Sequence, residues 1–145
     1  MILSSAQILN AQNRTEEENI RSAIEKMFDG MRDSDSSAVH SVFAQEAILN
    51  TIATDESGKT IVRKVDLKSF LNAVGAEKPE IWDERIHQYD IRIDGPLASV
   101  FTPYSFYRGE EFSHCGTNSF QMVKVSGEWK IFYLIDTRRQ QGCSS

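Results

Sequence analysis

Apolar residues in the first half of the chain recur at intervals of three and four positions, the spacing of one helical face. Just before them, Thr15 and Glu18 stand in the arrangement of a capping box, in which two side chains satisfy the first free amides of a helix. We therefore expect a helix over about residues 16–33. The apolar positions of its buried face are Ile20, Ile24, Met27, Phe28 and Met31.

Two shorter segments have the same helical pattern, each after an aspartate that can accept from free amides at a helix start. Asp35 precedes apolar residues that extend to Phe43, and Asp66 precedes others that extend to Val74, with Gly75 suited to end the helix. Between these two helices, residues 47–65 alternate loosely around a turn at residues 55–59. This segment therefore predicts a β-hairpin.

The second half of the chain changes to an alternating pattern, which is typical of strands. Turn residues, among them Ser126 and Gly127, divide the alternating segments, so that they form a meander. Helices followed by a meander predict an α+β fold, with a strongly curved antiparallel β-sheet wrapped around three N-terminal helices. The four expected strands cover residues 86–93, 99–107, 112–125 and 128–138.

Length and charge limit the kinds of protein to consider. The chain has 145 residues, of which 40% are hydrophobic and 26% charged, an ordinary balance for one globular domain. We assign residues 15–143 to that domain and residues 1–14 to an N-terminal extension. Sixteen basic against 21 acidic residues give a net charge of −5, and no basic block is longer than a short pair such as Arg138–Arg139. We therefore expect neither a nucleic-acid partner nor a membrane partner.

The N-terminus and the two cysteines bear on the cellular compartment. Residues 1–12 are weakly apolar but lack a basic start, so they are either a frayed extension or the remnant of a signal peptide. The protein is then cytoplasmic by default, and exported if the second interpretation holds. Cys115 and Cys143 form no metal-binding motif, and they are either two free thiols or one disulfide made by a tail that folds back.

Three motifs of the second half resemble a known superfamily. The segment GEWKI at residues 127–131, after three helices and a hairpin, is similar to the cone of the nuclear transport factor 2-like (SnoaL-like, cystatin-like) fold. The segments SHCGTNSFQ at 113–121 and DTRR at 136–139 resemble a bacterial family described as putative lumazine-binding. The resemblance covers about residues 15–143. Relatives include isomerases, polyketide cyclases, dehydratases and non-catalytic modules, so it implies a fold and a pocket rather than one reaction.

The strand register indicates which side chains face the helices. A two-residue turn pairs Val125 with Glu128, and alternation outward from that pair gives one mostly apolar and aromatic face, with Phe101, Pro103 and Ser105 on it. Such a face is typical of a small-molecule pocket. Strict alternation points Asp136 and Arg138 away from it, but one β-bulge would turn both inward. The candidate pocket residues are His87, Tyr89, Tyr107, His114, Asn118, Tyr133, Asp136 and Arg138.

The catalytic candidates in this pocket are few. His87 and His114 converge near Pro103 in this register, either as an acid–base pair or as two structural histidines. Because no third ligand has suitable spacing, we expect no metal site, and we expect no cofactor. Proton abstraction needs a carboxylate base in an apolar pocket. The meander offers none on its inner face, so only His114 or an inward Asp136 could serve.

Three functions remain open on these grounds. The first is a pocket protein that binds a small molecule. The second is a lyase or isomerase that abstracts a proton in the same pocket, and the third is a non-catalytic dimeric scaffold. Apolar residues on the outer sheet face, Val123, Phe132 and Leu134, predict a homodimer through that face.

Overall fold

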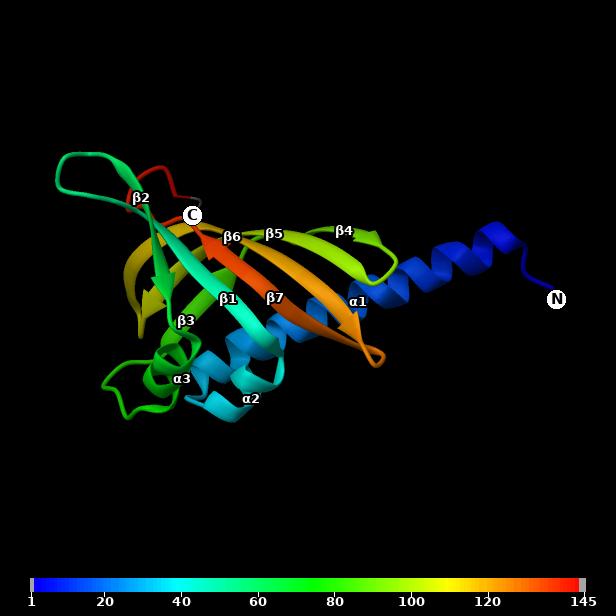
Figure 1. The fold of residues 1–145 in the computed structure, drawn as a ribbon, viewed down its shortest axis with the longest axis horizontal. Coiled ribbons are helices and arrows are strands. Elements are labelled where there is room, and N and C mark those ends of the chain that lie inside the picture. The colour runs from blue at the N-terminus through cyan, green and yellow to red at the C-terminus, as the bar shows by residue number, and fades with distance from the viewer. Residues whose placement is uncertain (1, 144–145) are drawn as a thin grey trace.

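The computed structural model describes residues 2–143, and residues 11–14 by their backbone alone. It contains three helices and seven strands in these residues (Figure 1). In chain order they are α1 (Ser5–Arg32), α2 (Ser36–Ser41), β1 (Phe43–Thr54), β2 (Thr60–Val65), α3 (Leu67–Gly75), β3 (Trp82–Ile86), β4 (Asp90–Asp94), β5 (Leu97–Arg108), β6 (Glu111–Val125) and β7 (Glu128–Asp136).

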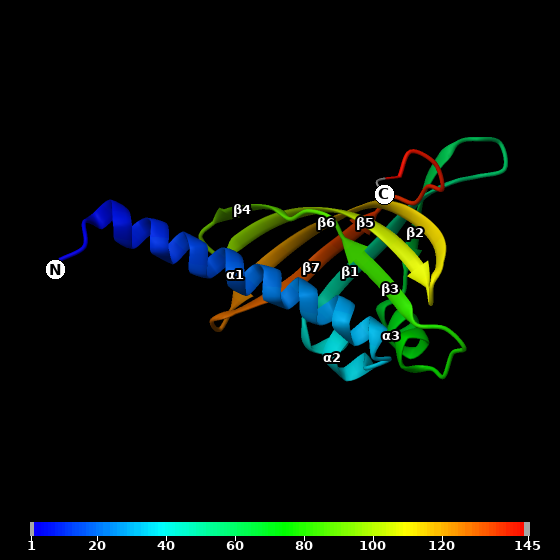
Figure 2. The same cartoon turned by 180° about the vertical axis from the view of Figure 1, so that it is seen from behind.

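All seven strands belong to one sheet, and the helices cover one face of it. The strand order is β2-β1-β7-β6-β5-β3, with β4 also paired to β5. The expected α+β class with three helices is confirmed, but the sheet is mixed, because β1 runs parallel to β7. This pairing brings a strand of the first half beside the last strand, which a simple meander does not provide. The sheet bends over the helices without curling strongly, so the expected strong curvature is wrong (Figure 2).

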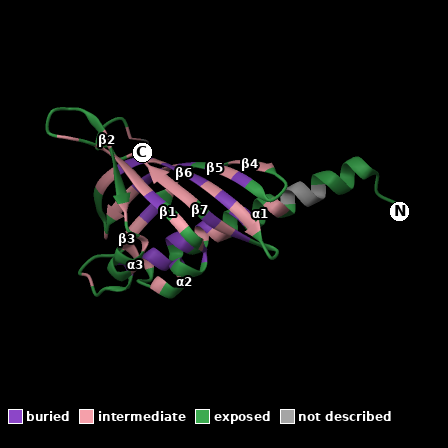
Figure 3. Cartoon of the chain, in the orientation of Figure 1, coloured by how far each residue is buried: buried purple, intermediate pink, exposed green. Residues whose placement is uncertain are grey.

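The buried face of α1 packs against the middle of the sheet. Ile20, Ile24 and Phe28 are buried as their spacing predicts, and the ring of Phe28 meets that of Phe120 edge to face at 6.4 Å. Buried positions alternate along β5 and β6 where these strands face the helix (Figure 3). The hydrophobic effect therefore fixes the helices on the concave face of the sheet.

The first helix starts earlier than the sequence pattern predicts. Ser4 caps it, with its hydroxyl accepting from the amide of Gln7 and the Gln7 side chain accepting from the amide of Ser4. Thr15 therefore does not begin the helix, and residues 5–14 of the expected extension are helical. This N-terminal part projects beyond the sheet (Figures 1 and 2), with Ile8 and Leu9 exposed. No helix within residues 2–143 is long and apolar enough to cross a membrane.

The shorter elements lie close to their predicted positions. Asp35 and Asp66 cap α2 and α3 by accepting from the amides of Ala38 and Ser69. The hairpin of β1 and β2 forms around the expected turn, but β1 begins at Phe43, which the sequence pattern placed in the preceding helix. The expected strand over residues 86–93 is broken into β3 and β4, which pair with different parts of β5.

Two bulges decide which side chains face inward. Between Gln121 and Met122 the register of β6 and β7 shifts by one residue, because Phe132 is inserted in β7. The insertion turns Leu134 and Asp136 toward the helices, and Tyr133 away from them. The bulge that the sequence allowed is therefore present.

The register of β5 differs from the expected one for a similar reason. Arg108 pairs with Glu111, so the turn comes one residue later than predicted. Ser113 is an inserted residue of β6, between His114, which pairs with Phe106, and Phe112, which pairs with Tyr107. The expectation that Phe101, Pro103, Ser105 and Tyr107 face the helices is therefore wrong. The residues that face inward are instead Ala98, Val100, Thr102, Tyr104 and Phe106.

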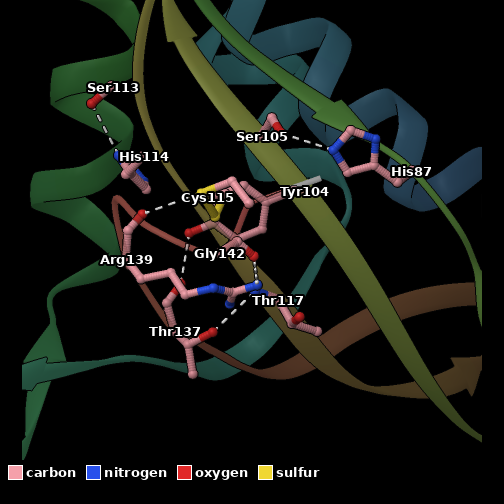
Figure 4. Close-up of a disulfide and its surroundings, with 11 residues drawn as sticks. His87, Tyr104, Ser105, Ser113, His114, Cys115, Thr117, Thr137, Arg139 and Gly142 are labelled. Carbon is pink, nitrogen blue, oxygen red and sulfur yellow. Dashed lines mark hydrogen bonds between the residues drawn. A yellow bond between two sulfur atoms is a disulfide. The ribbon is translucent and has the colours of Figure 1, made fainter. Parts of the chain in front are cut away.

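The C-terminal tail folds back onto the sheet. Cys115 and Arg139 exchange two backbone hydrogen bonds of 2.8 Å, which continue the pairing of β6 beyond the end of β7. Cys143 then reaches Cys115, and the two form a disulfide with 5.8 Å between their Cα atoms (Figure 4). Of the two states that the sequence left open, the structure contains the disulfide.

Candidate functional site

A cavity of about 260 Å³ lies between the helices and the concave face of the sheet. Its volume is slightly below the range of about 300–1,000 Å³ that is usual for small-molecule sites. Apolar side chains form most of its wall: Met27, Met31, Leu49, Val65, Phe70, Trp82, Phe106 and Leu134. Polar groups are added by Asn50, Thr51, Glu84, Arg108, His114, Asn118, Asp136 and Arg138.

Four polar residues form one line across the sheet, and we call this line the polar row: Thr51, Asp136, Asn118 and Thr102. The first three line the cavity, and Thr102 is fully buried. The four are direct partners on successive strands, β1, β7, β6 and β5. Each has a buried atom with no hydrogen-bond partner within the protein, namely Thr51 Oγ1, Asp136 Oδ1, Asn118 Nδ2 and Thr102 Oγ1. Because native proteins leave few buried polar groups unpaired, such a row indicates a binding surface.

One oxygen of Asp136 is held by its neighbours, which leaves the other free. Oδ2 accepts from Arg138 Nε at 3.2 Å and lies 3.4 Å from the Tyr104 hydroxyl. That hydroxyl also donates to the carbonyl oxygen of Thr137 at 2.7 Å. Burial and the charge of Asp136 raise the pKa of Tyr104 well above its usual value. Tyr104 is therefore a neutral donor that fixes the end of β7.

Glu84 is a buried carboxyl group of the cavity that the sequence analysis missed. Only 8% of it is exposed, and burial together with the negative charge of Asp136 raises its pKa to about 8. The Asn118 amide lies beside it and opposes this rise, although Asn118 Nδ2 makes no hydrogen bond of standard geometry. The expectation of a concave face without carboxylates is therefore wrong.

The signal for Glu84 was present in the sequence. Trp82, Glu84 and Ile86 alternate and share one face of β3, but the expected strand began at Ile86. Arg32 holds this strand by donating to the backbone carbonyl of Glu84 at 2.7 Å and to the carboxylate of Asp83 at 2.8 Å. An acidic residue at an apolar position of an alternating segment therefore indicates a buried carboxyl group.

His114 lies in the cavity wall in an aromatic setting. Its ring is 5.0 Å from that of Phe106 and meets that of Tyr104 edge to face at 5.8 Å, while Nδ1 is 3.0 Å from the Ser113 hydroxyl. Burial and the charge of Arg138 lower its pKa, so the imidazole is neutral near pH 7. With Asn118, Asp136 and Arg138, it belongs to the predicted residues that do line the cavity.

The other predicted residues lie elsewhere. His87 is exposed and reaches the Ser105 hydroxyl at 2.8 Å on the outer side of β5, so the expected convergence with His114 is wrong (Figure 4). Tyr107 lies beneath the guanidinium of Arg85 at 3.9 Å. Both errors follow from the insertion of Ser113 in β6, which reverses the faces of β5 relative to the expected ones.

Two of the predicted tyrosines lie outside the cavity. Tyr133 turns outward after the insertion of Phe132, and its hydroxyl accepts from Asn50 Nδ2 at 3.2 Å. Tyr89 lines a separate cavity of about 260 Å³ against α1, where Arg21 covers its ring at 4.6 Å. Burial raises the pKa of Tyr89 to about 12. Among residues 2–143 no group of three His, Cys, Asp or Glu side chains is arranged to hold a metal ion.

Solved structures with the same fold confirm the architecture. An NTF2-like protein with a cystatin-like fold from Novosphingobium aromaticivorans matches with a TM-score of 0.74 and 11% identity, over 99% of this chain and 95% of its own. A protein of unknown function from Mycobacterium tuberculosis matches with a TM-score of 0.74 and 12% identity, over 91% of this chain and 76% of its own. A putative scytalone dehydratase from N. aromaticivorans matches with a TM-score of 0.70 and 13% identity, over 94% and 99%.

These identities are low, so the solved structures show the fold and leave the activity open. No curated protein matches the chain. The model of one family matches residues 15–133, which is well over half of the sequence. The chain, which has the NTF2-like fold, therefore belongs to the family described as "Putative lumazine-binding".

Proposed function

We propose that the protein binds a small, flat organic molecule in the cavity beneath α1. The polar row supports this proposal most directly, because it places unpaired buried polar atoms beside a cavity that apolar side chains also line. Apolar walls can hold the faces of a ring system while the row hydrogen-bonds one of its edges. The name of the family, which refers to a bicyclic heterocycle, is consistent with a ligand of this shape.

Titration of the protein with lumazine by isothermal calorimetry and by thermal denaturation tests the proposal. We expect saturable binding and a rise in melting temperature. Leu134→Trp should block the cavity and abolish both effects, because Leu134 is part of its wall. Phe132→Trp is the matched control, since Phe132 lies two residues away and is exposed. Binding that survives Leu134→Trp would place the ligand elsewhere.

A second function, a lyase or isomerase that abstracts a proton, is favoured by Glu84. A carboxyl group whose pKa is raised toward working pH is a stronger base than an ordinary one, and an apolar pocket is the usual means of raising it. The neutral His114 lies in the same cavity wall as a hydrogen-bond donor for a developing oxyanion. The names of two neighbours, a putative scytalone dehydratase and a putative dehydratase of the NTF2-like family from Streptomyces avermitilis, are compatible with this chemistry.

Hydrogen exchange at the α-carbon of α-tetralone in heavy water provides a direct assay of this second function. The reaction breaks a carbon–hydrogen bond, transfers the proton to Glu84 and returns a deuteron from solvent. We expect Glu84→Gln to reduce the protein-dependent exchange by roughly 10²–10⁴-fold. Tyr107→Phe, on the outer face, should leave it unchanged. Equal exchange with both variants would exclude Glu84 as the base.

We also propose a homodimer through the outer face of the sheet. Ile48, Phe101 and Phe132 are exposed there, whereas Leu134 faces the cavity and is no part of this surface. A partner copy would remove these apolar side chains from water. Sedimentation of the wild type and of Phe132→Glu tests this, with a dimer expected only for the wild type.

A further inference from the structure

We propose that the polar row recognises the edge of a cyclic amide, in which a ring N–H stands next to a ring carbonyl. Asp136 Oδ1 accepts from the ligand N–H, and Asn118 Nδ2 donates to the ligand carbonyl. This inference rests on the proposed binding function and specifies the chemical class of the ligand.

Asp136 is built as a fixed acceptor. Its side chain is 15% exposed, and its Oδ2 atom is engaged by Arg138 at 3.2 Å and lies 3.4 Å from Tyr104. These contacts fix the orientation of the carboxylate and leave Oδ1 buried without a partner. An ionised carboxylate is an acceptor only, so this position selects a donor on the ligand.

Asn118 supplies the complementary group on the adjacent strand. It is 4% exposed, and its Nδ2 atom is a buried donor without a partner of standard geometry. Asn118 and Asp136 are direct partners between β6 and β7, so their side chains stand next to each other on one face. A buried donor without a standard hydrogen bond, next to an acceptor without one, matches a ligand edge with an acceptor beside a donor.

The rest of the row and the walls fit the same ligand. Thr51 lines the cavity next to Asp136 with a hydroxyl group, which can donate or accept and therefore tolerates either neighbouring atom of a ring. Phe106, Trp82 and Leu134 provide apolar surface for the ring faces. A ketone or an ether has no donor for Asp136, and an ionised carboxylic acid would place a negative charge against it, so the row disfavours these classes.

A pair of isosteric bicyclic probes tests the proposal. Isocarbostyril is a lactam with the required N–H and carbonyl, and isocoumarin is the corresponding lactone, in which an oxygen replaces the N–H. We expect the wild-type protein to bind isocarbostyril at least about tenfold more tightly in an NMR titration, because isocoumarin turns a lone pair toward Asp136. Lumazine, which also contains lactam edges, is titrated alongside both.

A variant of the row provides the second measurement. Asn118→Leu keeps a similar side-chain size and removes the donor, so the affinity for isocarbostyril should fall at least about tenfold. Ser119→Ala, its neighbour on the outer face, is the matched control and should bind as the wild type does. If Asn118→Leu fails to fold, the comparison of lactam and lactone on the wild type still decides the question.

The outcomes separate this inference from the function on which it rests. Equal affinity for lactam and lactone would overturn the assignment of the edge and leave the binding function standing. Failure of all three probes, including lumazine, to bind would contradict the binding function itself. Preference for the lactam that persists unchanged in Asn118→Leu would overturn the role of Asn118.

Discussion

Asn118 and Asp136 face each other across β6 and β7, and each holds one buried polar atom that makes no hydrogen bond of standard geometry within the protein. This relationship depends on the insertion of Phe132, because without it Asp136 would point away from the helices. A single inserted residue thus brings an acceptor beside a donor on an apolar face.

Glu84→Gln should change how stability depends on pH. In the folded protein the pKa of Glu84 is raised from 4.5 to about 8, so the folded state retains a proton that the unfolded chain has released. The free energy of unfolding therefore falls as pH rises from about 4.5 to about 8, by an amount on the order of a few kcal/mol. We expect the free energy of unfolding of the variant to lack this decline. The variant should therefore become more stable relative to the wild type as the pH approaches about 8.

Urea denaturation of both proteins at several pH values between 5 and 8, roughly the span of the shifted pKa, measures the effect. The contribution of His114 to the free energy of unfolding changes in the opposite direction. Because folding lowers the pKa of His114, this contribution rises with pH near the ordinary pKa of histidine. The difference between wild type and variant cancels this contribution. Parallel curves for the two proteins would show that Glu84 titrates normally.

The disulfide should be formed in the isolated protein and should stabilise it. Denatured, unreduced protein is expected to show no free thiols, since Cys115 and Cys143 are joined. Cys143→Ser should lower the free energy of unfolding by about 2–4 kcal/mol, since the loop loses its covalent closure. Reductant should lower the stability of the wild type to that of the variant and leave the variant unchanged. Two reactive thiols in the unreduced wild type would contradict the pairing.

Gly116 is expected to tolerate no side chain. A Cβ atom there would collide with the carbonyl oxygen of Thr137, the group that accepts from Tyr104. Gly116→Ala should therefore lower the free energy of unfolding by about 1–3 kcal/mol, as strained packing does. Gly75→Ala is the control, because its nearest neighbour is the movable side chain of Ser36 at 3.0 Å, and its effect should stay within about 1 kcal/mol. Equal effects of both substitutions in chemical denaturation would refute the close contact.

The helical face and the caps were predictable because they are local. The spacing of Ile20, Ile24 and Phe28 identifies the buried side of α1, and Asp35 and Asp66 mark where α2 and α3 begin. The helical start at Ser5 was missed because the capping box at Thr15 outweighed an equivalent one at Ser4.

The register of the sheet was not predictable in the same way. Since side chains alternate along a strand, one inserted residue reverses every assignment beyond it. The insertion at Phe132 moved Asp136 in and Tyr133 out, and the insertion at Ser113 moved Tyr107 out and Phe106 in. The position of a bulge depends on how the paired strands pack in the sheet, which the alternation along a single strand does not encode. Glu84 was lost for a related reason, because the break after β3 conceals the alternation that contains it.

The central claim is that the cavity with Asn118, Asp136 and Glu84 is the ligand site. The most direct test is a ¹⁵N-resolved NMR titration of the wild-type protein with lumazine, followed at the side-chain amide of Asn118. We predict saturable shifts of this amide and of the backbone amides of Glu84 and Leu134, with none at Tyr107 on the outer face. Saturable shifts confined to the outer face, or an Asn118 amide that does not respond, would contradict the account.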